Sequence, residues 1–381
     1  MALTTVSSDR LSTNVKTSNL GTELKKKVGQ NKNIIINGAM QVAQRGTSAT
    51  STTNGYHTVD RWGQSNGGLD NAATMAQVDV ASGTTPYTLG FKKAYKITNG
   101  DQTSVDTDDY YRIYQFVEAQ NMATSGWNYT STSSNITVSC WVKSSVAQNF
   151  YIELRTQDGT QQAYVWETGS LSADTWTKIT KTIPGNSNIQ IDNDNSHGPC
   201  LFIHLFNGTD MTGSLTLNQW AAYNTSIRTP DMTSTWYDTN DSTFELTGVQ
   251  LEVSDYATDF EHRSYAVEER LSKRYFNKYI GPVQINFVNE HPNNKSGYLY
   301  FPYEEVMRAA PTVTFGSNVT IGRPQVSVSQ LITTAGNIGN RSFNYVGWPS
   351  SSTLGSTGDA YYRMILIEND ANSTISCDAE L

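Results

Sequence analysis

The 381-residue sequence predicts an all-β protein built around a two-sheet antiparallel sandwich. Only 16% of the residues are charged, and Ser, Thr, Asn and Gly are abundant, a composition typical of a β protein with a hydroxyl- and amide-rich surface. Strand-like runs alternate with turn residues from about residue 75 to 253. The sequence has no strand–helix–strand alternation and no repeat of fixed period, which disfavours a parallel sheet, a β-helix and a propeller.

Eight strands are predicted in this region, at residues 94–97, 110–118, 135–142, 150–155, 163–167, 178–183, 200–206 and 243–253. The alternation is plainest in the third of them, where Ile136, Val138, Cys140 and Val142 share the face that we expect to be buried. The strand at 178–183 carries lysines. Because charge discourages pairing with another chain, this strand is typical of a sheet edge.

Two earlier motifs predict structure at the start of this domain. Residues 33–40, NIIINGAM, place three isoleucines before an Asn-Gly pair, which predicts a first, buried strand followed by a tight turn. Asp60, Arg61 and Trp62 follow one another. Because arginine can stack on an aromatic ring and pair with a carboxylate, we expect a structural cluster here rather than a ligand site.

The stretch 244–263, FELTGVQLEVSDYATDFEHR, is expected to be the last strand of the large domain and its closing tail. Its apolar positions fall on one face, which we expect to be buried: Val249, Leu251 and Val253. Gln250 and Glu252 fall on the other face. We expect Phe260 to dock the tail on the domain and Arg263 to lie at the start of the following helix.

The clearest helical pattern follows at 265–279, where Val267, Leu271 and Tyr275 lie on one apolar stripe. Ser264 is a suitable N-cap. Near the other end of the chain, within residues 1–32, Leu20, Leu24 and Val28 recur at helical spacing and predict a short helix or a frayed terminus. A helix this short must pack on a copy of itself, on the rest of the chain or on a docking partner.

Strands return after this helix and predict a second, smaller β domain, with strands at 283–288, 298–303, 312–315, 325–328, 343–346 and 360–368. The predicted organisation is therefore an N-terminal segment at 1–32, a large β domain at 33–264, a linker helix at 265–281 and a C-terminal β domain at 282–381.

Charge and cysteine content narrow the class of function. The formal net charge is −8 and the basic residues form no concentrated face, so nucleic acid is an unsuitable partner. The three cysteines, Cys140, Cys200 and Cys377, are widely spaced, which predicts buried free thiols rather than a zinc site. The start has no signal-peptide pattern, and no apolar run approaches the roughly 20 residues that span a bilayer. We therefore expect synthesis in a cytoplasm and no membrane insertion.

The sequence has no P-loop, G-x-G-x-x-G or H-E-x-x-H motif, and its five histidines are scattered, so we expect no enzymatic activity and no cofactor. Asp192 and Asp194, in the run DNDNS, resemble the start of a calcium loop, but Gly198 and Ile203 do not fit the EF-hand positions for glycine and glutamate. A turn stabilised by Asp and Asn side chains is one interpretation of this run. A structural calcium ion is the other.

Several stretches together resemble one family, at 33–40 (NIIINGAM), 44–46 (QRG), 60–62 (DRW), 248–252 (GVQLE), 260–263 (FEHR), 269–276 (ERLSKRYF), 307–313 (MRAAPTV) and 378–381 (DAEL). They are similar to the carbohydrate-binding-module-like jelly-roll domain, the following helix and the C-terminal domain of bacteriophage tail fibre and other virion appendage proteins. The resemblance implies a large jelly-roll sandwich with a smaller C-terminal β-sandwich. It also implies a trimer that is made in the bacterial host cytoplasm and released by lysis.

On this resemblance we expect a structural component of a phage particle, namely a tail fibre that attaches to polysaccharide on the host surface. Residues 1–32 would bind other virion proteins, and Val267, Leu271 and Tyr275 would pack around a threefold axis. Trp236, Tyr237 and Trp348 lie in polar stretches and are candidates for stacking on sugars. The alternatives are a head, collar or baseplate decoration that binds no receptor, and an appendage that degrades glycans.

Overall fold

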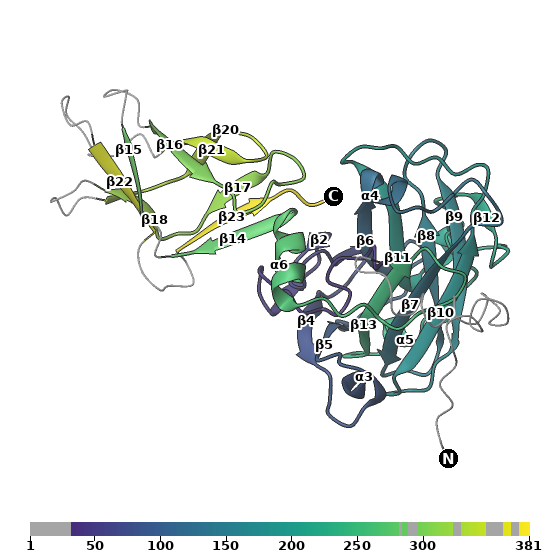
Figure 1. The fold of residues 1–381 in the computed structure, drawn as a ribbon. Helices are drawn as coiled ribbons and strands as arrows, with labels where there is room; N and C mark the ends of the chain where they lie inside the picture. The colour runs from purple at the N-terminus through teal and green to yellow at the C-terminus, as the bar shows by residue number, and fades with distance from the viewer. Residues whose placement is uncertain (1–31, 282–283, 289–295, 323–328, 348–360, 367–372) are drawn as a thin grey trace, which may run out of the picture.

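The computed structural model describes residues 32–281, 284–288, 296–322, 329–347, 361–366 and 373–381. The predicted N-terminal helix, the predicted strand at 325–328 and Trp348 lie outside these residues. Two β bodies are joined through helix α6 (Tyr265–Lys273), and the C-terminal end of the chain lies between them (Figure 1). The predicted all-β fold class is confirmed.

The first body is a two-sheet sandwich in which all strand pairs are antiparallel. One sheet has six strands, in the order β1 (Ser48–Ser51), β4 (Ala73–Asp79), β5 (Lys93–Thr98), β13 (Thr243–Glu252), β7 (Asn135–Ser144) and β10 (Thr177–Pro184). The other has seven, in the order β12 (Trp220–Ala222), β9 (Gln162–Ser170), β8 (Asn149–Arg155), β11 (His197–Asn207), β6 (Tyr110–Glu118), β3 (Gly63–Gly67) and β2 (Gly55–Tyr56). Short helical turns are α3 (Thr85–Thr88), α4 (Ala119–Ala123), η1 (Thr209–Met211) and α5 (Thr235–Asp238).

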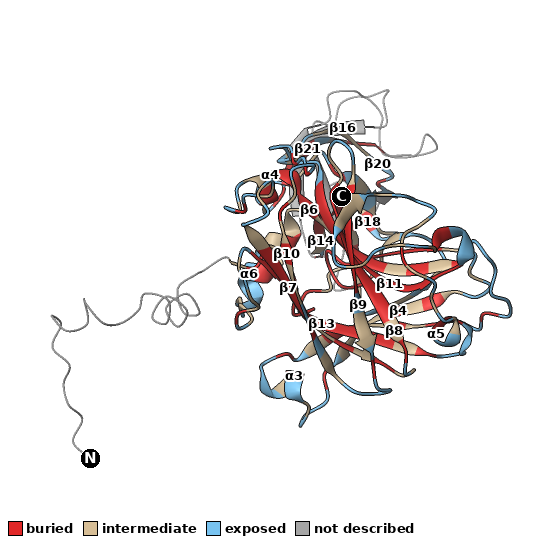
Figure 2. Cartoon of the chain, turned by 90° about the vertical axis from the view of Figure 1, so that its right-hand side faces the viewer, coloured by how far each residue is buried: buried red, intermediate tan, exposed pale blue. Residues whose placement is uncertain are grey.

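The eight strands predicted for this body are all present, and β10 lies at a sheet edge as its lysines predicted. Between the sheets lies one continuous core, which contains the predicted inward face of β7 together with Trp62, Trp166 and Trp236. Buried residues follow β7, β8, β11 and β13, whereas exposed residues gather in turns such as α3 (Figure 2). Among the described residues, none of the helices has the length and apolar content needed to cross a membrane.

Strand β13 is buried on both faces, which differs from the prediction of one polar, solvated face. Val249 and Leu251 lie in the core as expected, but Gln250 and Glu252 are also buried, at 0% and 2% exposure. The chain after β13 covers this polar face, because Glu252 accepts hydrogen bonds from the backbone and hydroxyl of Thr258. Gln250 Oε1 likewise accepts from the backbone N–H of residue 261. Burial of these side chains is therefore offset by hydrogen bonds.

The residues after β13 in the stretch 244–263 confirm two expectations and correct a third. Phe260 packs edge-on against Phe91, with 4.9 Å between ring centroids, and so docks the tail on the domain as predicted. Arg263 directly precedes the N-cap of α6, Ser264, also as predicted. Val253 lies beyond the end of β13 and is 39% exposed, so its predicted burial is wrong.

Residues 33–40 are buried, apart from the half-buried Ile34, but they do not form the predicted strand. Two isolated main-chain bonds join the segment to β13, from Ile34 to Leu251 and from Val249 to Gly38, and asparagine side chains take the place of a continuous ladder. Asn33 accepts from the backbone N–H of Leu251 and donates to the carbonyl of Val249, while Asn37 bonds to both backbone groups of Val42. Because such side chains satisfy the main chain locally, they compete with a β ladder, and the apolar run folds as an irregular buried segment.

Helix α6 is shorter than predicted. It ends at Lys273, and Phe276–Ile280 forms β14, the first strand of the second body, so Tyr275 and Phe276 are not helical. The residues that α6 buries are polar, namely Glu268 and Ser272. Tyr275, which the helical spacing assigns to the apolar stripe, belongs instead to the junction between helix and strand.

The second body consists of a three-stranded and a seven-stranded antiparallel sheet. The smaller sheet has the order β14, β23 (Thr374–Asp378) and β17 (Thr312–Phe315). The larger has the order β19 (Ser329–Leu331), β18 (Val319–Gly322), β22 (Tyr361–Leu366), β15 (Gln284–Val288), β16 (Ser296–Pro302), β21 (Ser342–Gly347) and β20 (Thr334–Ile338). Its core includes Phe301, Phe343 and Ile375.

The two bodies meet in a polar seam built around the last residues of the chain. Arg61 is 1% exposed, pairs with Glu380 and stacks on the ring of Tyr275, whose centroid lies 3.5 Å from the guanidinium carbon. The structural cluster predicted around Arg61 therefore exists, but the ring is Tyr275 rather than Trp62, and the carboxylate is that of Glu380 rather than Asp60. Arg45 also pairs with Glu380, at 3.4 Å.

Three further contacts tie the same seam. Arg274 forms a two-pronged pair with Glu118, with distances of 2.6 and 2.8 Å. Arg308 donates to the carbonyl oxygens of Ala379 and Glu380, at 2.8 and 3.0 Å. These contacts are directional and partly buried, and the Arg274–Glu118 pair links α6 to the first body in a fixed geometry.

Asp60 gives this region a pH dependence. Burial raises the pKa of Asp60 to about 6 from its usual 3.8, although Arg45 and the hydrogen bonds from Gln44 act in the opposite direction. Between about pH 4 and pH 6 the folded state therefore binds more protons than the unfolded state, and stability falls as the pH rises. We expect the free energy of unfolding of the unaltered protein to fall by on the order of 3 kcal/mol over this pH range. Asp60→Asn should abolish that fall. Denaturant unfolding of both proteins across pH 4–7 measures this, and identical slopes would contradict it.

Candidate functional site

Two of the residues predicted to stack on sugars are core residues. Trp236 and Tyr237 are both 0% exposed, because the single turn of α5 directs them into the sandwich. Tyr237 stacks on Phe206, with ring centroids 4.4 Å apart, and Trp236 lies 6.5 Å from Phe150. Their predicted role in carbohydrate binding is therefore wrong, and Trp348 lies outside the described residues.

The three residues predicted for oligomer packing do not share one surface. Val267 is 38% exposed and Leu271 is half-buried, so both reach the surface of α6. Tyr275 is 1% exposed and lies under Arg61 in the seam, where it has no surface to offer a second copy. The prediction for Tyr275 is wrong because the helix ends before it.

Of the two calcium candidates, Asp192 and Asp194, the second forms an Asx turn. Asp194 accepts a hydrogen bond from the backbone N–H of Ser196 at 2.9 Å, and the backbone N–H of Asp192 donates to Asp158 at 2.9 Å. Across the described part of the chain, no three acidic, histidine or cysteine side chains come together as metal ligands. Whether the loop holds calcium stays a prediction.

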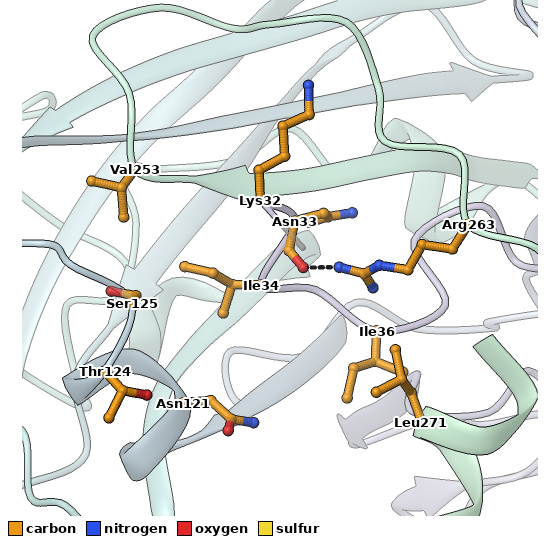
Figure 3. Close-up of a pocket in the computed structure, with 10 residues that line it drawn as sticks. All are labelled: Lys32, Asn33, Ile34, Ile36, Asn121, Thr124, Ser125, Val253, Arg263 and Leu271. Atoms are coloured by element: carbon orange, nitrogen blue, oxygen red, sulfur yellow. Dashed lines mark hydrogen bonds between the residues drawn. The ribbon is translucent and has the colours of Figure 1, made fainter. Parts of the chain in front are cut away.

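A cavity of about 500 Å³ lies beside α6, where residue 32 enters the first body (Figure 3). Its walls include Ile34, Val253 and Leu271. Its two cationic side chains are already engaged, because Arg263 donates to the carbonyl of Asn33 and Lys32 donates to Thr258. The cavity therefore offers little chemistry for a specific ligand.

The outward face of the seven-stranded sheet carries a denser group of functional side chains. Because alternate residues of β6, β8 and β11 point into the core, the residues between them point outward, as in the pairs Ile113/Arg112, Ile152/Glu153 and Ile203/His204. The neighbouring strand β3 has small residues, and the rings of Tyr110 and Tyr114 lie where side chains on Gly67 and Gly63 would otherwise project.

At the centre of this face lies a charged cluster, which we call the arginine cluster: Arg112, Arg155, Arg228, Glu153 and His204. Glu153 and His204 are both 0% exposed, and Glu153 Oε2 lies 2.9 Å from His204 Nε2. Arg155 Nε is 3.6 Å from the other oxygen of Glu153, which is an ion pair without a hydrogen bond. Charged side chains rarely occupy such buried positions without a functional or structural reason.

Aromatic rings hold the three guanidinium groups in place. Arg155 lies between two rings, with its guanidinium carbon 4.2 Å from the centroid of Phe202 and 4.0 Å from that of Tyr223. Arg112 also lies over Phe202, at 4.5 Å, and Arg228 lies over Tyr110, at 4.8 Å. Since stacking leaves the edges of a guanidinium free, these contacts fix the groups without using all their donors.

Hydrogen bonds orient the histidine at the base of the cluster. The side-chain amide of Asn207 lies 3.0 Å from His204 Nδ1 and 3.1 Å from the hydroxyl of Thr229. Burial lowers the pKa of His204 despite the opposing effect of Glu153, so the ring is neutral at pH 7. A neutral ring that accepts from Asn207 at Nδ1 carries its proton on Nε2, and it donates that proton to Glu153.

The arginine cluster is only partly covered. The chain after β11 crosses the same face, where Leu215, Leu217 and Met232 pack on a small apolar patch that includes Tyr151. Arg112, Arg228, Tyr110 and Tyr223 remain half-buried and reach solvent. The face therefore presents rings and planar cationic groups side by side, an arrangement suited to binding a polar ligand that has flat apolar faces.

The sequence contains a signal for this site that composition and motif searches do not detect. In 110–118 and 150–155 the same alternation that predicts the core places Arg112, Glu153 and Arg155 on the opposite face. Arg228 and Tyr223 come from the irregular chain after β11. Local sequence patterns do not specify how this chain folds back onto the sheet, so they do not predict that these two residues join the site.

No family model matches the sequence, and no curated protein matches it. Among solved structures, the chain is similar to the enzymatically active domain of tailspike protein 4 of bacteriophage CBA120, with 9% identity over 58% of this chain and 22% of that chain and a TM-score of 0.31. A putative sugar binding protein from Bacteroides thetaiotaomicron matches with 12% identity over 58% of this chain and 100% of that chain, with a TM-score of 0.31. The tandem CBM22-1-CBM22-2 domain of Paenibacillus barcinonensis Xyn10C gives 7% identity over 83% and 91%, with a TM-score of 0.24. The fold assignment therefore rests on the sheet topology described above.

Proposed function

We propose that the protein is a non-catalytic, glycan-binding structural component of a bacteriophage particle, in the simplest case a trimeric tail fibre that attaches the virion to polysaccharide on the host surface. The observation that carries the binding role is the arginine cluster with its half-exposed rings. Rings can stack on the apolar faces of sugars, and guanidinium edges can donate to their oxygens. The assignment to a virion rests on the sequence motifs alone.

Glycan binding is tested with the full chain on an immobilised panel of bacterial surface polysaccharides. We expect binding to at least one of them and a loss of about tenfold in affinity for Tyr223→Ala, corresponding to about 1.4 kcal/mol. Tyr265→Ala is the matched control. Tyr265 is 53% exposed, and it lies on α6, which contributes no residue to the arginine cluster. Absence of binding to every glycan, for a protein that still assembles onto particles, would favour an architectural decoration instead.

The trimer is tested separately by the mass of the protein in solution. We expect a species of three 42.1 kDa chains, with avidity from three sites raising the apparent affinity for a surface. Because Val267 and Leu271 reach the surface of α6, Leu271→Asp should weaken the assembly, whereas Tyr265→Ala should not. A monomer at all concentrations would contradict the trimeric fibre but would leave glycan binding open to its own test.

A further inference from the structure

The arginine cluster carries more positive charge than the chain neutralises. It holds three guanidinium groups and one carboxylate, that of Glu153, beside a neutral histidine. Over the residues that the structure describes, Arg112 and Arg228 have no carboxylate within ion-pair distance. This local excess is notable in a protein whose net charge is −8, because non-specific attraction of anions to the whole molecule is unfavourable.

The guanidinium groups also retain unused hydrogen-bond donors. Arg112 Nε and Nη1, Arg155 Nε and Arg228 Nη1 are buried and meet no acceptor from the described residues. Arg155 is 6% exposed, so this is not the ordinary case of a surface arginine bonded to solvent. Buried donors without an acceptor are uncommon in folded proteins, and these four lie on the three side chains of one cluster.

The three guanidinium groups repel one another, which indicates the sign of the missing acceptor. Burial and the charges of Arg155 and Arg228 lower the pKa of Arg112, so its protonated form is held at a cost. An anion placed against Arg112 and Arg228 would reduce this repulsion and accept from the parts of the two guanidinium groups that reach solvent. A neutral hydroxyl would accept a hydrogen bond but leave the excess charge in place.

We infer that the glycan bound by this face is acidic, with a carboxylate or sulfate group that contacts Arg112 and Arg228 while a sugar ring lies against Tyr223 or Tyr110. The planar guanidinium fork matches the two oxygens of a carboxylate and also two of the oxygens of a sulfate. This inference rests on the proposed glycan-binding function and adds the chemical class of the ligand.

The test uses the full chain and pairs of polysaccharides that differ only in charge. Polygalacturonate is compared with its carboxyl-reduced form, and dextran sulfate with dextran, by titration calorimetry. We expect the acidic member of at least one pair to bind about tenfold to a hundredfold more tightly, and the preference to shrink as salt is raised. The pair that responds distinguishes a carboxylate from a sulfate.

Two variants place the binding in the cluster. Arg228→Gln is expected to abolish the preference for the acidic member, and because Arg228 is half-buried on an irregular segment, the variant should remain folded. Arg112→Gln should do the same. Arg270→Gln is the matched control, since the side chain of Arg270 is 67% exposed on α6, and it should keep the preference.

The outcomes separate the two proposals. Equal binding of both members of each pair would overturn the acidic class while leaving glycan binding intact. A preference that survives Arg228→Gln and Arg112→Gln would overturn the assignment to this cluster. No binding to these probes or to any polysaccharide of the wider panel would overturn the proposed function together with the inference.

Discussion

Replacing Glu380 with alanine is expected to lower the free energy of unfolding by about 3–5 kcal/mol. The reason is that the buried cationic partner of Glu380, Arg61, remains in the variant. Arg61 is 1% exposed and would keep its charge in the seam without the carboxylate that pairs with it. Burial of the Glu380 side chain, which is 5% exposed, means that solvent screens this pair only weakly. Arg45 would lose one of its two acidic partners as well.

Denaturant unfolding monitored by tryptophan fluorescence measures this change. Asp79→Ala is the matched control, because Asp79 also pairs with a cation, Lys93, at 2.6 Å, but its side chain is 81% exposed. We expect the control to lose no more than about 1 kcal/mol. If the two variants lost the same amount, the seam would not be the buried electrostatic contact described above.

Replacing Trp236 with alanine is expected to cost about 3–5 kcal/mol, because the ring is fully buried in the main core and its removal leaves a cavity. Its contacts with Tyr111 and Phe150 would be lost together. The measurement is again the free energy of unfolding, with glycan binding followed in parallel under conditions where the variant is folded.

This experiment separates the core role from a role in binding. Tyr265→Ala removes a ring that is 53% exposed and should change stability by less than about 0.5 kcal/mol. A Trp236→Ala protein of unchanged stability that had lost affinity for glycan would restore the interpretation of Trp236 as a sugar platform. A protein that is destabilised but binds normally when folded agrees with the structure.

Periodicity predicted the regular strands well, because alternation is a local property. In β7 the same alternation that assigns Ile136 and Val142 to the core also fixes the register of the strand. The lysines of β10 likewise placed it at an edge. Short strands such as β1 and β12 were missed, since their sequences carry little apolar alternation and their pairing is decided by neighbours far away in sequence.

The errors have a common physical cause. At 33–40 the apolar content suggested a strand, but Asn33 and Asn37 satisfy the backbone in another way. The polar surroundings of Trp236 suggested exposure, but one helical turn reverses its direction. The arginine cluster was not anticipated because Arg112, Arg155 and Arg228 come from separate segments, and only the pairing of β6 and β8 with β11 brings the first two together. Tertiary contacts decide each of these cases.

The position of β13 has a consequence for how the protein is made. This strand lies between β5 and β7, so those two earlier strands have no shared partner until residues 243–252 leave the ribosome. The nascent chain must therefore carry two unpaired strand edges through the synthesis of the intervening segments. Long-range pairing of this kind is slow, and open edges promote aggregation. Chaperone dependence and the yield of folded protein should therefore differ sharply between chains truncated before β13 and chains that include it.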